Sequence, residues 1–276
     1  MMLQLTTGRV AASHWSWNFK RRGVLSRSEH FPVSDQIFLS GQQWSRLLEE
    51  HPILAGFSAA QLEQLRDLAA HFNKVKRFEA ADGLQLSGYM KASVSLQACL
   101  PILNLGLKWY SNWKTIVVVP AGFSQKQRKV DTAGVVHEWK EVHIGESWVK
   151  GPVVLSWKDV AASGRADGFN VVIHEAAHRL DLLDGAMNGR PALHREMSPE
   201  QWRVTFRAAY TDLAWRMSRA LPSAIDTYAL ENPGEFFAVL SEIFFERPRN
   251  ILMEYPGVYD LLKEFYRQDP VRRLTA

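Results

Sequence analysis

The segment FNVVIHEAAHRLDLLDG, residues 169–185, constrains the fold more than any other part of the chain. Its apolar residues predict a buried helix that ends near Gly185, because glycine suits the position just after a helix. Two histidines, His174 and His178, lie four residues apart in this run. Residues four apart project from one face of an α-helix, one turn above the other. The segment therefore predicts a helix that presents two imidazoles side by side.

Two imidazoles at this spacing can chelate one metal ion. Glu175, directly after the first histidine, is poorly placed as a third ligand but can take a proton from a water beside the metal. This is the arrangement of the H-E-x-x-H motif of zinc peptidases. Imidazole and carboxylate ligands suit zinc, and the single cysteine argues against a thiolate site, so we expect one Zn²⁺ per chain. The alternative interpretation is a pair of core histidines beside an exposed glutamate.

A catalytic zinc needs a third protein ligand and an open position for water. Asp184 lies where the metzincin pattern places its last ligand, but that pattern needs glycine at the position of Asp181. Glu235, in NPGEFFAVLSE, opens a later amphipathic helix and is the favoured candidate, although its spacing from Asn232 also fits a capping box. Glu242, seven residues further on, lies on roughly the same helical face and could ligate the metal or hold a ligand in place.

Three other residues are candidates for the site. Tyr228, in DTYAL, can donate a hydrogen bond to the oxygen of a peptide carbonyl under attack, or it is a half-buried structural tyrosine. His137 lies in a loop and is a surface side chain, a substrate contact or an extra metal ligand. Asp181 can orient an imidazole or pair with a basic residue such as Arg179. Spacing alone favours the structural alternatives for Tyr228 and His137.

The remaining patterns predict an α+β protein that is mainly helical with a small mixed β-sheet. Short runs in KRFEA, WKTIVVVPAGF and GPVVLSW predict strands. Two helices are expected on either side of HPILAGFS, the second capped by Ser58. A buried helix should be kinked or ended by Pro101, and later helices should begin at Ser198 and at Asn232. The helix after Asn232 should stop before Pro248, and YPGVYDLLKEFYRQDP should form the last helix.

The composition fits one folded domain. The chain has 276 residues, 46% of them hydrophobic, which is enough to bury a sizeable core. Residues 1–34 are basic and irregular, and we expect a loosely ordered leader there. Residues 35–276 are expected to form a single catalytic domain with a helical subregion at its N-terminal end.

Charge and cysteine content limit the partners and the compartment. The net charge is +4 and the basic residues are scattered, so direct binding of nucleic acid is not expected. No apolar run reaches the ~18 residues that a membrane helix needs, and no signal peptide is evident. The only cysteine, Cys99, allows no intramolecular disulfide, which fits a reducing compartment. A cytoplasmic location is expected.

At these residues the chain resembles the Mlc titration factor A family of bacterial zinc-dependent peptidases, over roughly residues 35–272. The resemblance is carried by HPILAGFSAAQLEQLRDLAAHF, LQACLPILNLGLKWY, GESWVKGPVVLSW, HEAAHRLDLLDG, YALENPGEFFAVLSEIFF and FYRQDP. The block QACLPILNLGL is specific and has no catalytic purpose of its own, so chance convergence does not explain it.

The resemblance implies a zincin-like catalytic core with His174, His178 and Glu235 as zinc ligands and Glu175 as general base. It also implies roles for His137, because the family has a metal-assigned histidine in the corresponding loop, and for Tyr228. A fourth protein ligand would occupy the position that water needs, as in a resting, self-inhibited state. The family is further linked to binding the sugar-responsive transcription repressor Mlc.

The expected function is therefore a zinc-dependent peptidase that acts on peptide or protein substrates and also binds a repressor of the Mlc type. An aminopeptidase is one form of such an enzyme, although the sequence does not distinguish cleavage at an amino terminus from internal cleavage. The alternative is a non-catalytic protein that binds a regulator, with a structural or vestigial zinc site.

Overall fold

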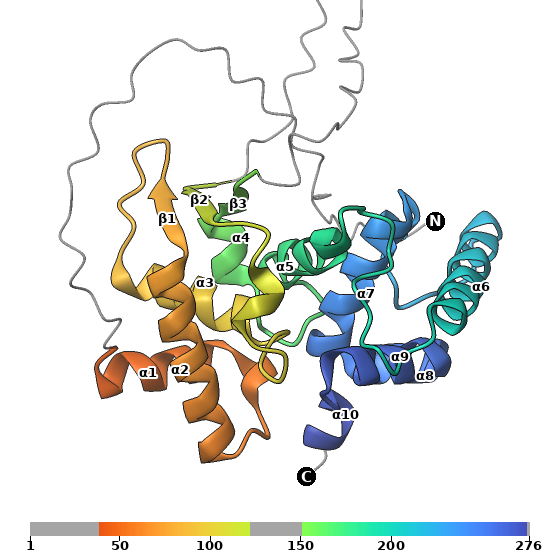
Figure 1. The fold of residues 1–276 in the computed structure, drawn as a ribbon, viewed down its shortest axis with the longest axis horizontal. Helices are drawn as coiled ribbons and strands as arrows, with labels where there is room; N and C mark the ends of the chain where they lie inside the picture. Colours follow the sequence, from red (N-terminus) through yellow and green to blue (C-terminus); the bar gives the residue numbers. More distant parts are fainter. Residues whose placement is uncertain (1–38, 122–150, 275–276) are drawn as a thin grey trace, which may run out of the picture.

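A computed structural model describes residues 39–121 and 151–274 of the chain (Figure 1). Residues 39–121 form α1 Gly41–Glu50, η1 Pro52–Leu54, α2 Ala59–Val75, β1 Arg77–Ala80, α3 Gly88–Cys99, η2 Leu107–Tyr110 and β2 Thr115–Val119. Residues 151–274 begin with β3 Val153–Ser156 and α4 Trp157–Ala162. The remaining elements are α5 Val171–Asp181, η3 Leu182–Asp184, α6 Pro199–Ser218, η4 Thr227–Leu230, α7 Pro233–Glu246, α8 Pro248–Glu254, α9 Pro256–Tyr266 and α10 Pro270–Arg273. The predicted leader, residues 1–34, lies outside the described residues, as does His137.

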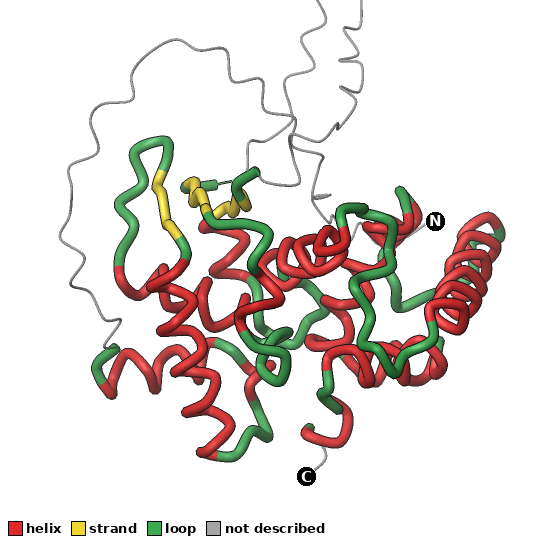
Figure 2. The backbone as a smooth tube through the Cα atoms, in the orientation of Figure 1, coloured by secondary structure: helices red, strands yellow, loops and turns green. Residues whose placement is uncertain are grey.

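Helices dominate the described part of the molecule, and the strands gather along one side (Figure 2). The predicted helix starts are confirmed: the side chains of Ser58, Ser198 and Asn232 each accept a hydrogen bond from the main-chain N–H three residues on. These oxygens satisfy donors that a helix leaves without partners in its first turn. The helix α3 ends at Cys99, just before Pro101, as the sequence predicted.

The three described strands form one sheet in the order β1-β2-β3. Both pairs are parallel, with Arg77 opposite Thr115 and Ile116 opposite Val153. The α+β class is confirmed, but the described strands pair only in parallel, whereas the sequence pattern predicted a mixed sheet. Parallel pairing follows from the connection between β1 and β2, which runs through α3 and is far too long for a hairpin. Of the described strands, β3 lies at an edge.

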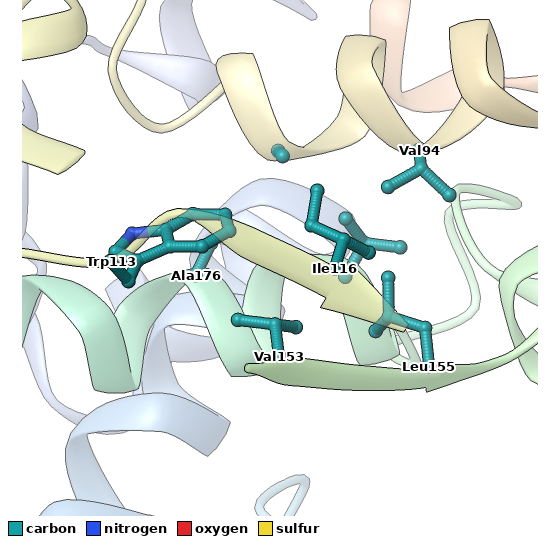
Figure 3. Close-up of a pocket in the computed structure, with 8 residues that line it drawn as sticks. Val94, Trp113, Ile116, Val153, Leu155 and Ala176 are labelled. Atoms are coloured by element: carbon teal, nitrogen blue, oxygen red, sulfur yellow. The ribbon is translucent and has the colours of Figure 1, made fainter. Parts of the chain in front are cut away.

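The helices α3 and α5 meet the sheet around a small apolar cavity (Figure 3). Its volume is about 10 Å³, so the packing here is nearly complete and the cavity is too small for a ligand. It is lined by Val94, Ala98, Trp113, Ile116, Val153, Leu155, Val172 and Ala176. The sheet therefore serves as a support on which α5, the helix with the two histidines, is held in place.

On the other side of α5 lies α7, and the helices α8 and α9 pack around α7 (Figure 1). Every residue of α7 from Gly234 to Glu246 is buried. The prediction that α7 stops before Pro248 is confirmed, but Pro248 itself begins α8, a helix that the sequence pattern did not predict. Proline is tolerated at the first helical position, so it can both end one helix and start the next. Within residues 39–121 and 151–274, no helix has the length and apolar composition of a membrane-spanning segment.

Candidate metal centre

The helix α5 places both histidines on its buried face. Its first turn is capped by Asn170, whose Oδ1 accepts a hydrogen bond from the N–H of Ile173 at 3.0 Å. His174 and His178 are only 5% and 9% exposed. Their Nε2 atoms lie 3.1 Å apart, as the spacing of four residues in a helix predicts. The expectation of two imidazoles side by side on a buried helix is thus confirmed.

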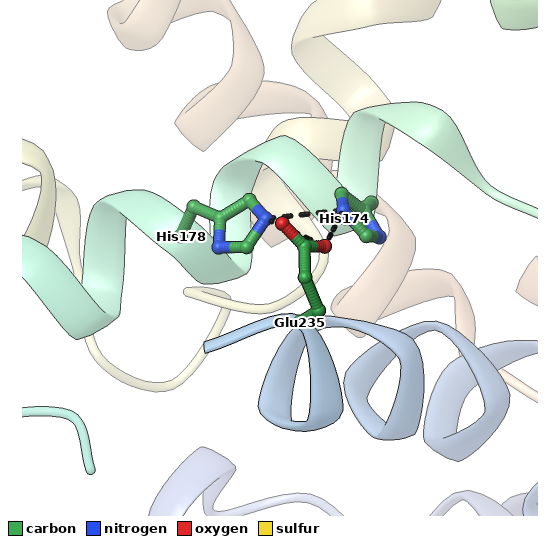
Figure 4. A group of neighbouring side chains, drawn as sticks. All are labelled: His174, His178 and Glu235. Carbon is green, nitrogen blue, oxygen red and sulfur yellow. Dashed lines mark hydrogen bonds and ion pairs between the residues drawn. The ribbon is translucent and has the colours of Figure 1, made fainter. Parts of the chain in front are cut away.

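Glu235 reaches the same point from the first turn of α7 (Figure 4). The side chain of Asn232 accepts from the N–H of Glu235 at 3.0 Å, so half of the predicted capping box forms. The carboxylate of Glu235 does not complete the box. It turns to the histidines, with Oε2 3.0 Å from His174 Nε2 and 3.3 Å from His178 Nε2. Three potential ligand atoms from two helices therefore converge.

The spacing of these three atoms fits one tetrahedral ion. Two ligand atoms about 2.05 Å from a zinc ion at the tetrahedral angle lie about 3.3 Å apart. The three observed separations are 3.0, 3.1 and 3.3 Å. Glu235 Oε2 is buried and makes no hydrogen bond of good geometry with any described residue, although two imidazole nitrogens lie close to it. Three ligand atoms this close together could hold one cation.

The charges of the centre also suit a cation. Burial disfavours the charged form of His174, but the carboxylates of Glu242 and Glu235 outweigh it and raise the pKa of the imidazole well above its usual range. Burial likewise opposes ionisation of Glu235, but the neighbouring imidazoles of His174 and His178 hold the pKa of its carboxyl well below its usual range. The site is thus built to hold positive charge between two carboxylates, and a divalent ion can replace the proton on the imidazole.

Glu242 contacts His174 rather than the convergence point. Its Oε1 lies 2.7 Å from Nδ1 of His174, and its Oε2 accepts from the N–H of Asn170 at 2.8 Å. An imidazole that donates through Nδ1 keeps the lone pair of Nε2 free for a metal. Of the two roles that the sequence left open for Glu242, the geometry favours holding a ligand in place.

Glu175 and Tyr228 lie next to the three potential ligands. Glu175 is half-buried on α5, and its negative charge acts on both His174 and Tyr228. Tyr228 lies in η4, where its N–H donates to Asp226 Oδ1 at 2.9 Å, and its ring centroid is 6.1 Å from that of His174. Burial, and then the carboxylate of Glu235, raise the pKa of the Tyr228 phenol well above its usual range. The phenol therefore stays protonated and can donate a hydrogen bond.

Asp181 has a different partner from the imidazole that the sequence suggested. Its Oδ2 accepts from the N–H of Gly189 at 2.7 Å, and among the described residues no hydrogen bond joins it to His174 or His178. Burial raises the pKa of Asp181 to about 6. Asp184, which sequence analysis discounted as a ligand, pairs with Arg190 at 3.4 Å.

Asn170 also belongs to the centre, although the sequence pattern did not indicate it. It is fully buried, caps α5 and contacts two glutamates of α7. The only local signal is its position just before the helix, since asparagine is a preferred N-cap residue. Nothing in that position indicates contacts with α7.

Comparison with known proteins places the chain in a family. A model of the glucose-regulated metallo-peptidases M90 matches residues 26–267. The chain is 38% identical over 227 residues to the Mlc titration factor A of Klebsiella pneumoniae (strain 342), which covers 81% of this chain and 85% of the relative. It is 33% identical over 266 residues to the Mlc titration factor A of Salmonella schwarzengrund (strain CVM19633), which covers 95% of this chain and 94% of the relative. These matches show that the chain belongs to the family of glucose-regulated metallo-peptidases M90, and the three side chains that could hold a metal ion are consistent with it.

Proposed function

We propose that the protein is a zinc-dependent peptidase in which His174, His178 and Glu235 hold one Zn²⁺. The observation that carries the proposal is the convergence of three buried ligand atoms at separations of 3.0 to 3.3 Å. Two imidazoles and one carboxylate form a ligand set typical of catalytic zinc, which leaves a fourth position for water or substrate. The metal requirement of the family supports the same conclusion.

When bound, zinc acts as a Lewis acid that polarises the substrate carbonyl and makes a nearby water more acidic. Glu175 takes the proton from the attacking water and later returns it to the leaving amine. Tyr228 donates a hydrogen bond to the carbonyl oxygen as negative charge develops there. Glu242 holds His174 in the orientation that directs Nε2 to the ion. The charge of Glu175 on His174 and Tyr228, and the hydrogen bond between Glu242 and His174, support these roles.

The substrate backbone is proposed to pair with β3. This strand lies at an edge of the described sheet, next to α4 and α5, so its outer main-chain groups can bond an extended peptide. Such pairing recognises the main chain and tolerates many side chains. Whether the enzyme then removes residues from an amino terminus or cuts internally is decided by a digest of blocked and unblocked peptides.

The proposal is tested with Glu175→Gln. We expect this variant to bind Zn²⁺ as the wild type does and to lose peptide hydrolysis, because the amide cannot accept the proton. Zinc content is measured by elemental analysis, and cleavage is measured on a peptide library with and without chelator. Hydrolysis by a clean preparation of the variant would contradict the role of Glu175, and a wild type that retains no zinc would contradict the metal site.

A second function, binding of a transcription repressor of the Mlc type, is supported by the name of the relatives, Mlc titration factor A. Such a partner would place the protein in the cytoplasm. A pull-down with purified repressor tests it, using wild type and His174→Ala. If binding is separate from catalysis, His174→Ala retains the repressor while it loses hydrolysis. No retention by either protein would contradict the second function and leave the peptidase proposal intact.

A further inference from the structure

We propose that Asn170 and Glu246 are positioning residues of the metal centre, which act on His174 through Glu242. The inference rests on the proposed zinc site and adds two residues that do not themselves touch the ion. It is carried by an unbroken series of hydrogen bonds that begins at Nδ1 of His174 and ends at the main chain of Gly164.

The first step is the division of the Glu242 carboxylate between two donors. Its Oε1 lies 2.7 Å from Nδ1 of His174, while its Oε2 accepts from the main-chain N–H of Asn170 at 2.8 Å. Glu242 is itself only 7% exposed, so water does not compete freely for either oxygen. The orientation of the carboxylate, and with it that of the imidazole, therefore depends on where the main chain of Asn170 lies.

The second step is the way in which Asn170 is fixed. Its Oδ1 caps α5 by accepting from the N–H of Ile173 at 3.0 Å, and its Nδ2 donates to Oε1 of Glu246 at 2.9 Å. The side chain is fully buried. Both ends of the amide are thus used, one on the helix of the histidines and one on α7.

The third step is the anchor that Glu246 provides. It follows Glu242 by four residues on α7, so the two carboxylates lie on one face, a turn apart. Glu246 is 2% exposed, and its Oε1 also accepts from the N–H of Gly164 at 3.0 Å. Glu246 therefore ties both ends of the segment 164–170 to α7, the helix that supplies Glu235.

These contacts set the relative position of the two helices that carry the potential ligands. Glu242 and Glu246 fix α7 against the residue that starts α5, and the ligand atoms need separations near 3.3 Å to share an ion. A cap that only stabilised α5 would contribute to folding without changing affinity for the metal. A positioning role predicts a loss of metal affinity that exceeds what the loss of a helix cap elsewhere produces.

The test measures Zn²⁺ affinity by competition with a chromophoric chelator. Asn170→Ser keeps a capping oxygen but loses the amide donor, and Glu246→Leu removes the acceptor while filling the space. Each should lower Zn²⁺ affinity about tenfold, at the low end of what loss of a partner around a ligand costs. Glu246→Gln retains an acceptor oxygen and should restore affinity to within about threefold of the wild type. Ser58→Ala, which removes the cap of the remote helix α2, should leave the affinity unchanged.

Two further readouts separate positioning from a general loss of structure. With excess Zn²⁺, Asn170→Ser should lower kcat for peptide hydrolysis and leave KM nearly unchanged, because substrate contacts are intact. In a Glu242→Ala background, the same Asn170→Ser change should no longer lower Zn²⁺ affinity, because the residue through which it acts is gone.

The outcomes distinguish this inference from the proposed function. If wild type binds Zn²⁺ and Asn170→Ser and Glu246→Leu bind it as tightly as Ser58→Ala, the positioning role is wrong while the zinc site stands. The positioning role is also wrong if Asn170→Ser lowers Zn²⁺ affinity as much in the Glu242→Ala background as in the wild type. If the wild type binds Zn²⁺ but cleaves no peptide, the proposed peptidase activity is wrong. The comparison of Zn²⁺ affinities still tests the positioning role in that case. If Glu246→Leu does not fold, Asn170→Ser gives the result alone.

Discussion

At the scale of single residues, the centre is a set of carboxylates that each hold an imidazole or a main-chain group in place. His174 lies between two of them, Glu235 at Nε2 and Glu242 at Nδ1. Burying that much negative charge is unfavourable unless a cation compensates it. One proton on the imidazole compensates only part of it, whereas a divalent ion compensates more. The proposed zinc ion would therefore offset the buried negative charge of the centre more completely than a proton does.

Tyr228→Phe tests the proposed hydrogen bond to the developing oxyanion. We expect kcat to fall by roughly 10²- to 10³-fold, the usual cost of losing one such donor. Zn²⁺ affinity should stay within about twofold of the wild type, because loss of the phenol leaves all three proposed ligands in place. Tyr210→Phe is the matched control, since its phenol donates to Leu230 at the end of η4 at 2.7 Å and lies outside the centre. Equal losses in both variants would show that η4 is merely disturbed.

The titration of Glu246 predicts a pH dependence of stability. Burial raises its pKa from 4.5 to about 7. Between these values the folded chain keeps a proton that the unfolded chain has released, so the free energy of unfolding falls as pH rises from 5 to 8. Glu246→Gln lacks this group, and its decrease should be smaller by on the order of 2 kcal/mol. Urea unfolding of both proteins at several pH values, with chelator present, measures this difference. If the free energy of unfolding changes equally with pH in both proteins, the pKa of Glu246 is not raised.

At the scale of elements, the loop after η3 positions the start of α7. Gly189 donates its N–H to Asp181 and accepts from Nε1 of Trp202 at 3.0 Å. Its φ is +77°, and a Cβ at this position would lie 2.3 Å from the carbonyl oxygen of Pro233. Glycine is thus required both by the backbone conformation and by the close approach. Because Pro233 begins α7, this contact helps to place Glu235 two residues later.

Gly189→Ala should therefore destabilise the fold and weaken the metal centre together. Its matched control is Gly83→Ala, at a glycine with the same φ of +77° and no atom within 4 Å of the added Cβ. The control should cost about 1 kcal/mol, from backbone strain alone. Gly189→Ala should cost at least about 2 kcal/mol more, because main chain must move. Zn²⁺ affinity should fall only in Gly189→Ala. Equal affinities in the two variants would show that this loop does not position Glu235.

The sequence predicted those features that depend on residues close along the chain. The caps Ser58, Ser198 and Asn232 act within three residues, so the starts of their helices could be identified. The spacing of four between His174 and His178 fixed their common face for the same reason. Pro248 was interpreted only as a stop, although it begins α8, because proline permits either outcome until the packing decides.

Features that depend on distant partners could not be predicted in this way. Glu235 and Glu242 share a helical face, and spacing alone does not say which points to Nε2 and which to Nδ1 of His174. Asn170 meets Glu242 and Glu246 across 72 and 76 residues of sequence, and no local pattern records that meeting. The parallel pairing of the strands is likewise a property of the connections rather than of the strands.

At the scale of the whole molecule, a segment without catalytic residues joins the early helices to the last ones. Where α3 ends, the carbonyl of Leu100 accepts from Gln268 Nε2 at 2.7 Å and that of Leu103 accepts from Gln64 Nε2 at 3.0 Å. Asn104 Nδ2 donates to the carbonyl of Arg267 at 2.7 Å. The block QACLPILNLGL therefore has a structural role in the described part of the molecule. It bonds to α2 on one side and to the end of α9 on the other.

Zinc is expected to add a second connection of this kind, because its proposed ligands come from α5 and α7. A ligand that binds only the folded state stabilises it by about 2.7 kcal/mol at a concentration of 100 Kd. For a protein of this size that corresponds to a rise in Tm of roughly 5–10 °C. Glu235→Gln should lose most of this rise, because it removes the charged ligand that belongs to α7.

Glu175→Gln should keep the full rise, since it alters the proposed base and no proposed ligand. Thermal unfolding of the three proteins, each with chelator and with excess Zn²⁺, measures these shifts side by side. A rise in Glu235→Gln as large as in the wild type would mean that the ion binds elsewhere or to the histidines of α5 alone. In that case zinc could not couple the two helices, and the convergence of Glu235 on the imidazoles would be a feature of packing only.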